Sequence, residues 1–496
     1  MRPFIDFIWK EPGNRLFLLI ALVGSLLEFI LFKFLYPYPD FFSDSYSYIY
    51  VASAHLDIGI WPIGYSKFLA LFHAITHSDT ALVAFQYFFL EVAALYFFFT
   101  LLYFYRLSKA TSIVLFVSLF FNPLFLYICN YVNSDPLFAA LSLLWLTELL
   151  WIIQRPRPYQ VFTQAVLLFL AFTVRYNALY YPIIGALAFV LSRHTFRIKI
   201  AGALLGILLI GAFIIHSRNE ANKLTGTRQF SLFSGWQLAN NALYIYDKIS
   251  VDSAELPSAQ SRELDRFSKH FYKHAIPGIY EALSSYTGNF FFRRPESPLI
   301  RYMYSHYRFS NEYGGIIAWG RSSAVFSEYG SYILKHHPVA FVRYFALMNA
   351  KNYFVPPLEK LEVYNLGEDK VWPVAQRWFD YKTPVVTCAS KDVQGSILFL
   401  YPAIFLIVNL YLIGLVVWYV VSKKYKLATR KFNFTILLTV AFLVMNFLFC
   451  ITATILVFRY EFFPMIICLS FSLLLSEVFE LKTAPAGRSR LLSSAG

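Results

Sequence analysis

Charged residues are scarce in this chain. Asp, Glu, Lys and Arg make up 15% of its 496 residues, whereas hydrophobic residues make up 58%. Soluble domains are about 25% charged, so this composition excludes an ordinary soluble protein. Cysteine is also scarce, and none of the four cysteines has a CxxC or metal-ligand spacing. The sequence therefore predicts neither a zinc site nor a disulfide framework, and leaves open one bridge between Cys129 and Cys388.

What the chain has instead is a series of apolar stretches, many of them long enough to cross about 30 Å of hydrocarbon. We expect an α-helical polytopic membrane protein with about ten membrane helices. The first stretch is too long for a cleaved signal peptide, and no small-residue cleavage site follows it. No internal repeat is evident. The expected helices cover about 15–37, 79–104, 110–128, 135–153, 160–174, 178–192, 198–216, 397–421, 432–455 and 459–479.

Basic residues predict the orientation of these helices, because cytoplasmic loops of membrane proteins carry an excess of Lys and Arg. One set of segments between the predicted helices holds eighteen Lys and Arg residues, whereas the opposite set holds only Lys33, Lys67, Arg175 and Arg459. Both termini are therefore expected in the cytoplasm. The net charge of +14 is then mostly anchoring charge and predicts no nucleic-acid partner. The eighteen residues on the cytoplasmic side are Arg2, Lys10, Arg15, Arg106, Lys109, Arg155, Arg157, Arg193, Arg197, Lys199, Lys423, Lys424, Lys426, Arg430, Lys431, Lys482, Arg488 and Arg490.

This orientation divides the chain into four predicted units. Residues 1–216 form an N-terminal membrane module with a first outer loop at 38–78. Residues 217–396 form a mostly helical soluble domain on the outer side. Residues 397–480 hold the last membrane helices, and 481–496 form a disordered cytoplasmic tail.

An acid, Asp44, lies in the first outer loop just after the first span. Ser43 is a suitable helix N-cap, and on a helix over 43–56 the side chains of Asp44, Tyr48 and His55 share one face. A carboxylate placed there can accept a proton from a hydroxyl nucleophile, which accelerates a reaction by ~10²–10⁴-fold. The alternative is that Asp44 only caps a surface helix or pairs with Lys67.

Two arginines lie at predicted outer helix ends, Arg175 at the break between the fifth and sixth helices and Arg459 at the start of the last. Cations at membrane depth are costly and usually functional, and a guanidinium matches phosphate oxygens as a bidentate fork. Both arginines, with Lys67, are therefore candidates for binding a phosphate. The alternatives are hydrogen bonds from Arg175 to carbonyls at the helix break, and a pair between Arg459 and Glu461.

Further acids lie at or inside the predicted spans. Asp135 precedes Pro136 at the start of the fourth helix, where it is either part of a catalytic site or an ordinary helix opening. Glu28, Glu91 and Glu148 lie inside spans. They form either a proton path of a transporter or isolated acids held by hydroxyl groups of neighbouring helices.

In the 217–396 segment, Trp236 lies beside the amides of Gln237, Asn240 and Asn241. A flat ring among amides suits sugar hydroxyls, but the same pattern describes an ordinary amphipathic helix. The sequence leaves both interpretations open.

Four stretches, taken in their order, resemble the motifs of one family. DSYSYIYVA (44–52) is similar to an acidic first-outer-loop motif, and WPIGYSKFLALF (61–72) to a Pro-Gly-Tyr segment entering a juxtamembrane helix. NSDPLFAALSLLWL (133–146) is similar to the acidic start of a fourth helix, and FRYEFFPMIICL (458–469) to the Arg-Tyr…Pro opening of a late helix. Together they resemble the membrane-embedded GT-C glycosyltransferases, especially bacterial relatives of the protein mannosyltransferases and the lipid A aminoarabinose transferase.

This resemblance implies a GT-C-like fold in a bacterial inner membrane, with the active site facing the periplasm. It implies inverting transfer of a sugar from a polyprenyl-phosphate lipid to a hydroxyl or amine of a lipid, glycan or protein acceptor. The catalytic candidates are Asp44 and Asp135, and the donor-phosphate candidates are Arg175, Arg459 and Lys67. The substrate-binding candidates are Tyr48, His55, Tyr65, Tyr176, Trp236 and Glu461.

The first loop departs from the family pattern, because it has one clear acid in place of a doubled pair. The sequence therefore assigns no cofactor and leaves a divalent cation open. Two other functions also stay open. One is a GT-C-type ligase or polymerase that transfers a whole glycan, and the other is a flippase or transporter of lipid-linked sugars.

Overall fold

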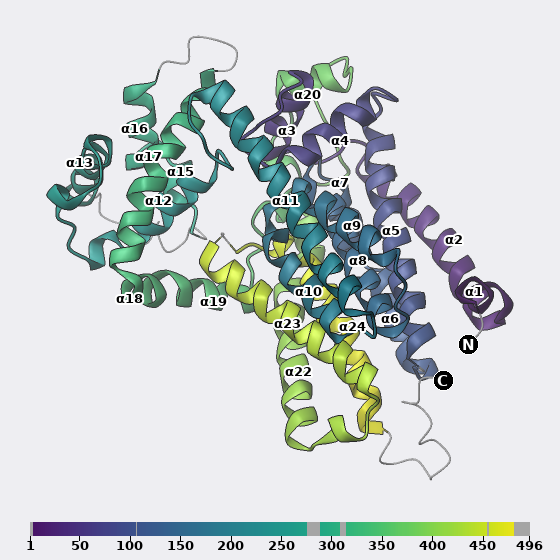
Figure 1. The fold of residues 1–496 in the computed structure, drawn as a ribbon. Helices are drawn as coiled ribbons and strands as arrows, with labels where there is room; N and C mark the ends of the chain where they lie inside the picture. The colour runs from purple at the N-terminus through teal and green to yellow at the C-terminus, as the bar shows by residue number, and fades with distance from the viewer. Residues whose placement is uncertain (1–2, 106, 275–287, 308–313, 454–455, 481–496) are drawn as a thin grey trace.

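Figure 1 shows the fold in a computed structural model, which describes residues 3–105, 107–274, 288–307, 314–453 and 456–480. Within these residues the chain is helical, with two isolated β-bridges and no strand. The predicted tail at 481–496 lies outside the described residues, as do 275–287 and 308–313 of the predicted outer domain.

The helices follow one another in three groups along the chain. The first group is α1 (Phe4–Lys10), α2 (Pro12–Leu35), α3 (Ser43–Ser53), α4 (Ile63–His73), α5 (Asp79–Phe104), α6 (Lys109–Phe120), α7 (Pro123–Asn130), α8 (Ser134–Gln154), α9 (Gln160–Val174), η1 (Tyr176–Tyr180), α10 (Tyr181–Leu191) and α11 (Phe196–Thr225). The second group is α12 (Ser234–Tyr244), η2 (Tyr246–Lys248), η3 (Ser253–Glu255), α13 (Ala259–Lys273), α15 (Phe290–Arg293), α16 (Pro298–His306), α17 (Gly314–His336), α18 (Pro338–Phe341), η4 (Val342–Ala346), α19 (Leu347–Phe354), η5 (Glu359–Leu361), η6 (Tyr364–Gly367), α20 (Pro373–Trp378) and α21 (Val393–Leu398). The third group is α22 (Tyr401–Val421), η7 (Lys424–Lys426), α23 (Arg430–Ala453), η8 (Phe458–Tyr460) and α24 (Phe462–Glu480).

Seven helical stretches of the described chain are long and apolar enough to cross a membrane, and three shorter apolar helices accompany them. All of them lie where the sequence predicts a membrane helix, so the expectation of a helical membrane protein is confirmed at this level. The long stretches are Pro12–Leu35, Asp79–Phe104, Lys109–Asn130, Ser134–Gln154, Phe196–Thr225, Val393–Val421 and Arg430–Ala453. The shorter ones are Gln160–Val174, Tyr176–Leu191 and Phe462–Val478.

Helix α8 lies at the centre of these helices and packs against α5 and α9. Its Trp145 is fully buried and stacks on Tyr181 of α10. The peripheral helices α2 and α11 instead expose large apolar side chains, such as Leu31 and Leu208, which are 63% and 65% exposed. Exposed leucines along whole helices are unfavourable in water, whereas the hydrocarbon of a bilayer is as apolar as the side chains themselves.

The acids inside the spans are held by hydroxyl groups. Ser25 donates to Glu91 across 3.2 Å, and Tyr87 donates to Glu28 across 3.3 Å, so both pairs join α2 to α5. Thr163 of α9 donates to Glu148 of α8 across 2.6 Å. These contacts are those expected of isolated structural acids. The four cysteines, including Cys129 and Cys388, are free thiols.

Helix ends that the sequence assigns to the same side lie together. At the predicted outer end, Ala389 donates its N–H to the Leu35 carbonyl across 2.8 Å, and Tyr401 donates to Asn122 across 2.7 Å. At the opposite end, Lys431 donates to the Gln154 carbonyl across 2.6 Å. The alternating direction of the helices therefore agrees with the charge pattern, while the side of the membrane that each end faces stays a prediction.

The 217–396 segment divides between two hydrophobic cores. Helices α12, α13, α16 and α17 build a core of their own around Trp236 and Phe326, seen to the left in Figure 1. The later part, from η5 to α21, instead shares the core of the membrane helices, through residues such as Leu361 and Tyr364. Within this part α20 packs on α3, and α21 packs on α7. This return of the chain brings residues from the middle of the sequence to the predicted outer end of the bundle.

Helix α11 connects the membrane helices to the second core and continues past the predicted boundary at 216. It ends at Gly226, whose φ of +75° suits glycine. Arg321 of α17 donates to the carbonyl of Thr225 across 3.0 Å. Helix α17 then packs tightly on α12, since a Cβ at Gly235 would lie 1.8 Å from the carbonyl oxygen of Ser323. The end of α11 is therefore joined to α12 through close backbone contacts.

Candidate functional site

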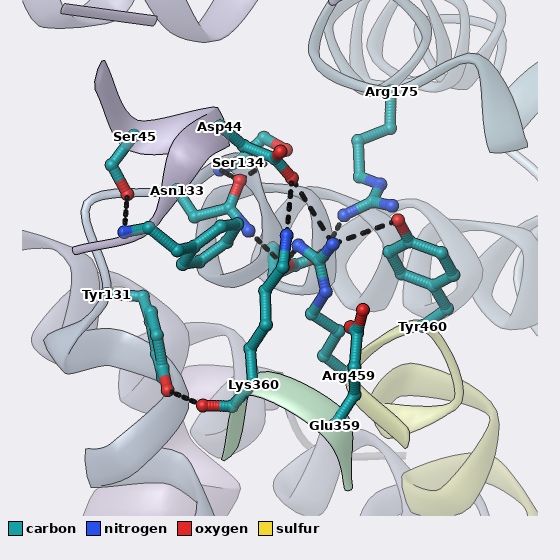
Figure 2. Close-up of polar contacts among 12 residues, drawn as sticks. Asp44, Ser45, Tyr131, Asn133, Ser134, Arg175, Glu359, Lys360, Arg459 and Tyr460 are labelled. Carbon is teal, nitrogen blue, oxygen red and sulfur yellow. Dashed lines mark hydrogen bonds and ion pairs between the residues drawn. The ribbon is translucent and has the colours of Figure 1, made fainter. Parts of the chain in front are cut away.

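Four charged residues from distant segments meet at the predicted outer end of the bundle. Three of them, Asp44, Arg175 and Arg459, are labelled in Figure 2. Asp44 lies in the first turn of α3, and Asp135 lies in the first turn of α8. Arg175 ends α9, and Arg459 lies in η8 just before α24. All four belong to the residues that the sequence singles out. They meet because each one lies at a helix end on the same side of the bundle.

Arg459 is the centre of this cluster. Its Nη1 donates to Asp135 Oδ2 across 3.1 Å, and its Nη2 donates to Asp44 Oδ2 across 3.3 Å. Arg175 donates to the other oxygen of Asp135 through Nη1. Asp135 therefore bridges both guanidinium groups. Its side chain and that of Arg459 are each 7% exposed, so these ion pairs are shielded from water and screened little by salt.

Lys360, in the η5 turn, is a further member of the cluster that the sequence analysis missed. Its Nζ lies 3.6 Å from Asp44 Oδ2, and Tyr131 fixes the turn by donating to the Lys360 carbonyl across 2.5 Å. The neighbouring Glu359 adopts a φ of +55°, which is unusual for a residue with a side chain. Arg293 of α15 donates to Glu359 across 2.7 Å. The surrounding LEKLE sequence (358–362) has no feature that distinguishes it from a surface turn.

The cations control the charge of the acids. Burial raises the pKa of Asp44, but Lys360 and Arg459 more than offset it and hold the pKa of that carboxyl below its usual range. The pKa of Glu359 is likewise lowered, because Lys360 and Arg293 outweigh burial. Burial lowers the pKa of the Lys360 amine to about 8, against the attraction of Asp44. Asp44 is therefore ionised and paired in this arrangement.

Two aromatic rings support the cations. The ring centroid of Phe42 lies 4.0 Å from Lys360 Nζ and 4.9 Å from the guanidinium carbon of Arg459. The ring of Tyr460 lies 4.3 Å from that carbon in Arg175 and 4.7 Å from it in Arg459. Such cation–π contacts favour a cation over a ring face by ~0.5–2 kcal/mol, the larger values where the site is desolvated. They keep the guanidinium groups in place beside the acids.

A cavity of about 260 Å³ opens beside the cluster. Of the candidate residues, Asp44, Tyr48, Arg175, Tyr176 and Arg459 line it. The remaining walls are aromatic and polar, and one wall comes from α12 and the residues before it. The residues of that wall are Phe230, Ser231, Phe233, Ser234 and Gln237. The cavity thus joins cations, one carboxylate and flat apolar surface.

Asp44 is held differently from the sequence expectation. Phe42, not Ser43, is the N-cap of α3, and its N–H is bonded to the Ser45 hydroxyl across 3.2 Å. The helix ends at Ser53, so His55 lies beyond it, exposed, with a φ of +51°. The prediction that His55 shares a helix face with Asp44 is therefore wrong.

The tyrosine candidates occupy two layers. Tyr48 donates to Ser134 across 3.0 Å and lines the cavity. Tyr65 lies behind it, fully buried, with its ring edge-on to Tyr48 at 4.9 Å, and donates to Gln86 across 2.7 Å. Tyr65 therefore supports Tyr48 from behind and is not among the described residues that line the cavity.

Three other candidates lie apart from the cluster. Lys67 is about half exposed and forms an ion pair with Asp57 at 2.5 Å. The ring of Trp236 is fully buried and stacks on Trp319 at 3.9 Å. Ser234 and Gln237 of the same helix line the cavity instead. Glu461 is buried and accepts from Asn446 across 3.3 Å. Among the described residues Arg459 pairs with Asp44 and Asp135, not with Glu461.

The charged side chains of this cluster suit an anion better than a divalent cation. A metal at this site would need the carboxylate oxygens of Asp44 and Asp135. Those oxygens already contact Arg459, Arg175 and Lys360, so a metal ion would face three positive charges. In the described ranges no three His, Cys, Asp or Glu side chains form a metal-binding group. We therefore derive no chemistry through a metal.

Comparison with protein-family models, with curated proteins and with solved structures gives no match for this chain.

Proposed function

We propose that this chain is an inverting glycosyltransferase that moves a sugar from a polyprenyl-phosphate lipid to an acceptor hydroxyl or amine. The acceptor belongs to a lipid, a glycan or a protein, and the site faces the outer side of a bacterial inner membrane. One observation carries the proposal: the guanidinium groups of Arg175 and Arg459 and the carboxylate of Asp44 line a single cavity at the ends of the apolar helices.

The two arginines suit the phosphate of the donor. A charge-assisted hydrogen bond to such a group contributes ~1.5–3 kcal/mol, and a guanidinium offers two parallel N–H groups to its oxygens. The phosphate of a membrane lipid lies at the level where the spanning helices end. A cavity at those helix ends therefore receives the phosphate while the lipid chain stays in the bilayer.

The reaction needs one base and no acid. The acceptor oxygen or nitrogen attacks the anomeric carbon and forms the new glycosidic bond, while the bond from that carbon to the phosphate oxygen breaks. The phosphate leaves with the electron pair, and Arg175 and Arg459 stabilise its developing charge. The proton of the acceptor passes to the carboxylate of Asp44. A single displacement inverts the anomeric carbon. Glycosidases, by contrast, use two carboxylates that flank the bond.

Asp135 has a different role from that of Asp44 in this proposal. It contacts both arginines and is not among the described residues that line the cavity. Asp135 therefore orients the two guanidinium groups toward one phosphate and takes no proton.

The ion pairs set the order of binding. While Lys360 and Arg459 both contact Asp44, the carboxylate is a weak base, because the two cations hold its pKa below the usual range. A donor phosphate competes for the guanidinium of Arg459 and so withdraws a cation from Asp44. The carboxylate then becomes a stronger base once the donor is bound. Donor binding therefore precedes activation of the acceptor.

The test compares cells with and without the gene by mass spectrometry of their glycans and lipid-linked sugars. We expect one sugar to disappear from an acceptor and its lipid-linked form to accumulate. Purified chain should then transfer that sugar without any ion gradient, which a transporter would not do. Unchanged glycans and unchanged lipid-linked sugars would overturn the proposal. Transfer of a whole glycan in place of one sugar would identify a ligase or polymerase.

A further inference from the structure

Counted with Arg293, whose side chain is 36% exposed, the cluster carries one more positive charge than negative. Among the described residues that contact one another here, the acids are Asp44, Asp135 and Glu359. The cations are Arg175, Arg293, Lys360 and Arg459. A buried site with an excess cation attracts an anion, because charges interact strongly where water is excluded.

Lys360 supplies one of these positive charges without facing the cavity. It is 7% exposed and is not among the described residues that line the cavity, whereas Asp44 and Arg459 are. In Figure 2 it rises from the η5 turn toward Asp44, alongside Arg459. The ring of Phe42 and the bond from Tyr131 to its carbonyl hold it there. Lys360 therefore touches Asp44 and not a ligand in the cavity.

Arg459 divides its guanidinium between Asp44 and Asp135. An incoming phosphate must take over part of this hydrogen bonding. If Asp44 had no other cation, the loss of Arg459 would leave a buried carboxylate unpaired, which is strongly unfavourable. Lys360 already lies on the same oxygen of Asp44, so it remains as a partner when Arg459 turns away.

We propose that Lys360 is a positioning residue that neutralises Asp44 while Arg459 binds the donor phosphate, and thereby gives the cavity its affinity for that phosphate. This inference rests on the proposed function, since it assigns a role to a neighbour of the same site. It also gives the 217–396 segment a part in donor binding, because the η5 turn belongs to that segment.

The ionisation of Lys360 makes this role measurable. The charged groups that face it are Asp44 from α3, Arg459 from η8, Arg293 from α15 and Glu359 from its own turn. Burial lowers the pKa of its amine to about 8, so Lys360 loses its charge as the pH rises through that value. A phosphate monoester is already a dianion there, since its second pKa is about 6. A loss of affinity above pH 8 therefore reports on the protein.

The experiment measures binding of geranyl phosphate, a short prenyl phosphate, to the full chain purified in detergent between pH 6.5 and 9. We expect affinity to fall about tenfold as Lys360 is neutralised, which is the effect of one buried charge at effective protein dielectric. Lys360→Arg should keep its affinity up to pH 9, because arginine stays charged. Lys360→Met should bind about tenfold more weakly at pH 7, with no further fall at high pH.

Two controls accompany these measurements. Geraniol lacks the phosphate and should show no such dependence on pH. Lys391→Met removes a partly exposed lysine that pairs with Asp369 in the same segment, and should leave the affinity unchanged. Because Lys360→Arg and the wild-type pH titration need no loss of the side chain, they decide the question even if Lys360→Met fails to fold.

The outcomes separate the two proposals. Wild-type binding that does not change with pH, or an equal fall with pH in Lys360→Arg, would overturn the role of Lys360 while the phosphate site stands. Absence of geranyl phosphate binding by the wild-type chain at every pH would overturn the phosphate site itself, and the role of Lys360 with it.

Discussion

Two ion pairs on the predicted outer side of this protein show how differently the same chemistry is used. Lys67 and Asp57 lie 2.5 Å apart, with side chains 48% and 53% exposed. Arg459 and Asp135 lie 3.1 Å apart, with side chains 7% exposed. An exposed pair contributes ~0–1 kcal/mol, whereas removal of one partner from a buried pair costs ~3–5 kcal/mol. The sequence marks both cations as unexpected, and only their burial separates them.

Among the ion pairs, the largest expected effect is that of Arg459→Met on stability. This change removes the cation that joins Asp44 and Asp135 and leaves each acid one cationic partner among the described residues, Lys360 or Arg175. We therefore expect the free energy of unfolding to fall by ~3 kcal/mol, the lower end of the range for a broken buried pair. Thermal unfolding of the purified chain in detergent measures it. A variant as stable as the wild type would show that the buried cluster contributes no more to stability than the surface pair does.

The next effect concerns turnover and compares two acids of the first outer loop. Asp44→Asn keeps the shape of the side chain but removes the proton acceptor, so we expect turnover to fall by ~10²-fold or more with the protein still folded. Asp57→Asn removes the matched surface acid and should leave turnover unchanged. Normal turnover in Asp44→Asn would return Asp44 to a purely structural role.

A third comparison tests whether the two arginines act on one phosphate. Arg175→Lys and Arg459→Lys each keep the charge but lose the bidentate fork, so each should lose part of ~1.5–3 kcal/mol in donor affinity and turnover. Because both would hold the same group, the losses in the double variant should not simply add. Strict additivity in donor binding would mean that the arginines bind separate groups.

Asp40 extends the comparison, because it is buried and has no cation beside it among the described residues. It accepts the N–H of Asn365 across 2.9 Å, and burial raises its pKa to about 8. The unfolded chain releases this proton near pH 4 and the folded chain near pH 8. Stability is therefore full below pH 4 and falls as the pH rises from 4 to 8, by at most ~1.4 kcal/mol per unit.

Asp40→Asn removes this ionisation while it keeps a carbonyl oxygen for Asn365. We expect the variant to gain thermal stability over the wild type progressively between pH 5 and pH 8. A constant difference across that range would show that Asp40 is ionised in the folded chain.

The smallest effect is expected for Lys67→Met. The surface pair with Asp57 should contribute no more than ~1 kcal/mol, and donor binding should be unchanged. A large loss of donor affinity in this variant would place Lys67 in the phosphate site after all, as the sequence predicts.

The helices were predictable from sequence because each apolar stretch is a local signal. The meeting of Asp44, Asp135, Arg175 and Arg459 was partly predictable, because the charge pattern places their helix ends on one side. Lys360 was not. It reaches Asp44 across 316 residues of chain (360 − 44), and only the return of the η5 turn to the bundle brings them together. No local pattern encodes a contact of that kind.

The burial of individual side chains also could not be predicted from the sequence. Trp236 and Gln237 are neighbours on one helix, yet the ring is enclosed against Trp319 while the amide lines the cavity. Which of them faces the cavity depends on how α12 rotates against α17. That rotation is fixed by the backbone contact at Gly235, a feature visible only in three dimensions.

Helix α11 has 30 residues and so spans about 45 Å, whereas the hydrocarbon of a bilayer is about 30 Å thick. The surplus acts as a rigid stalk that ends against α17, which in turn carries α12 and its wall of the cavity. A helix of this length adapts to a thinner bilayer by tilting, and its far end then moves sideways. We therefore expect the thickness of the bilayer to influence the width of the cavity.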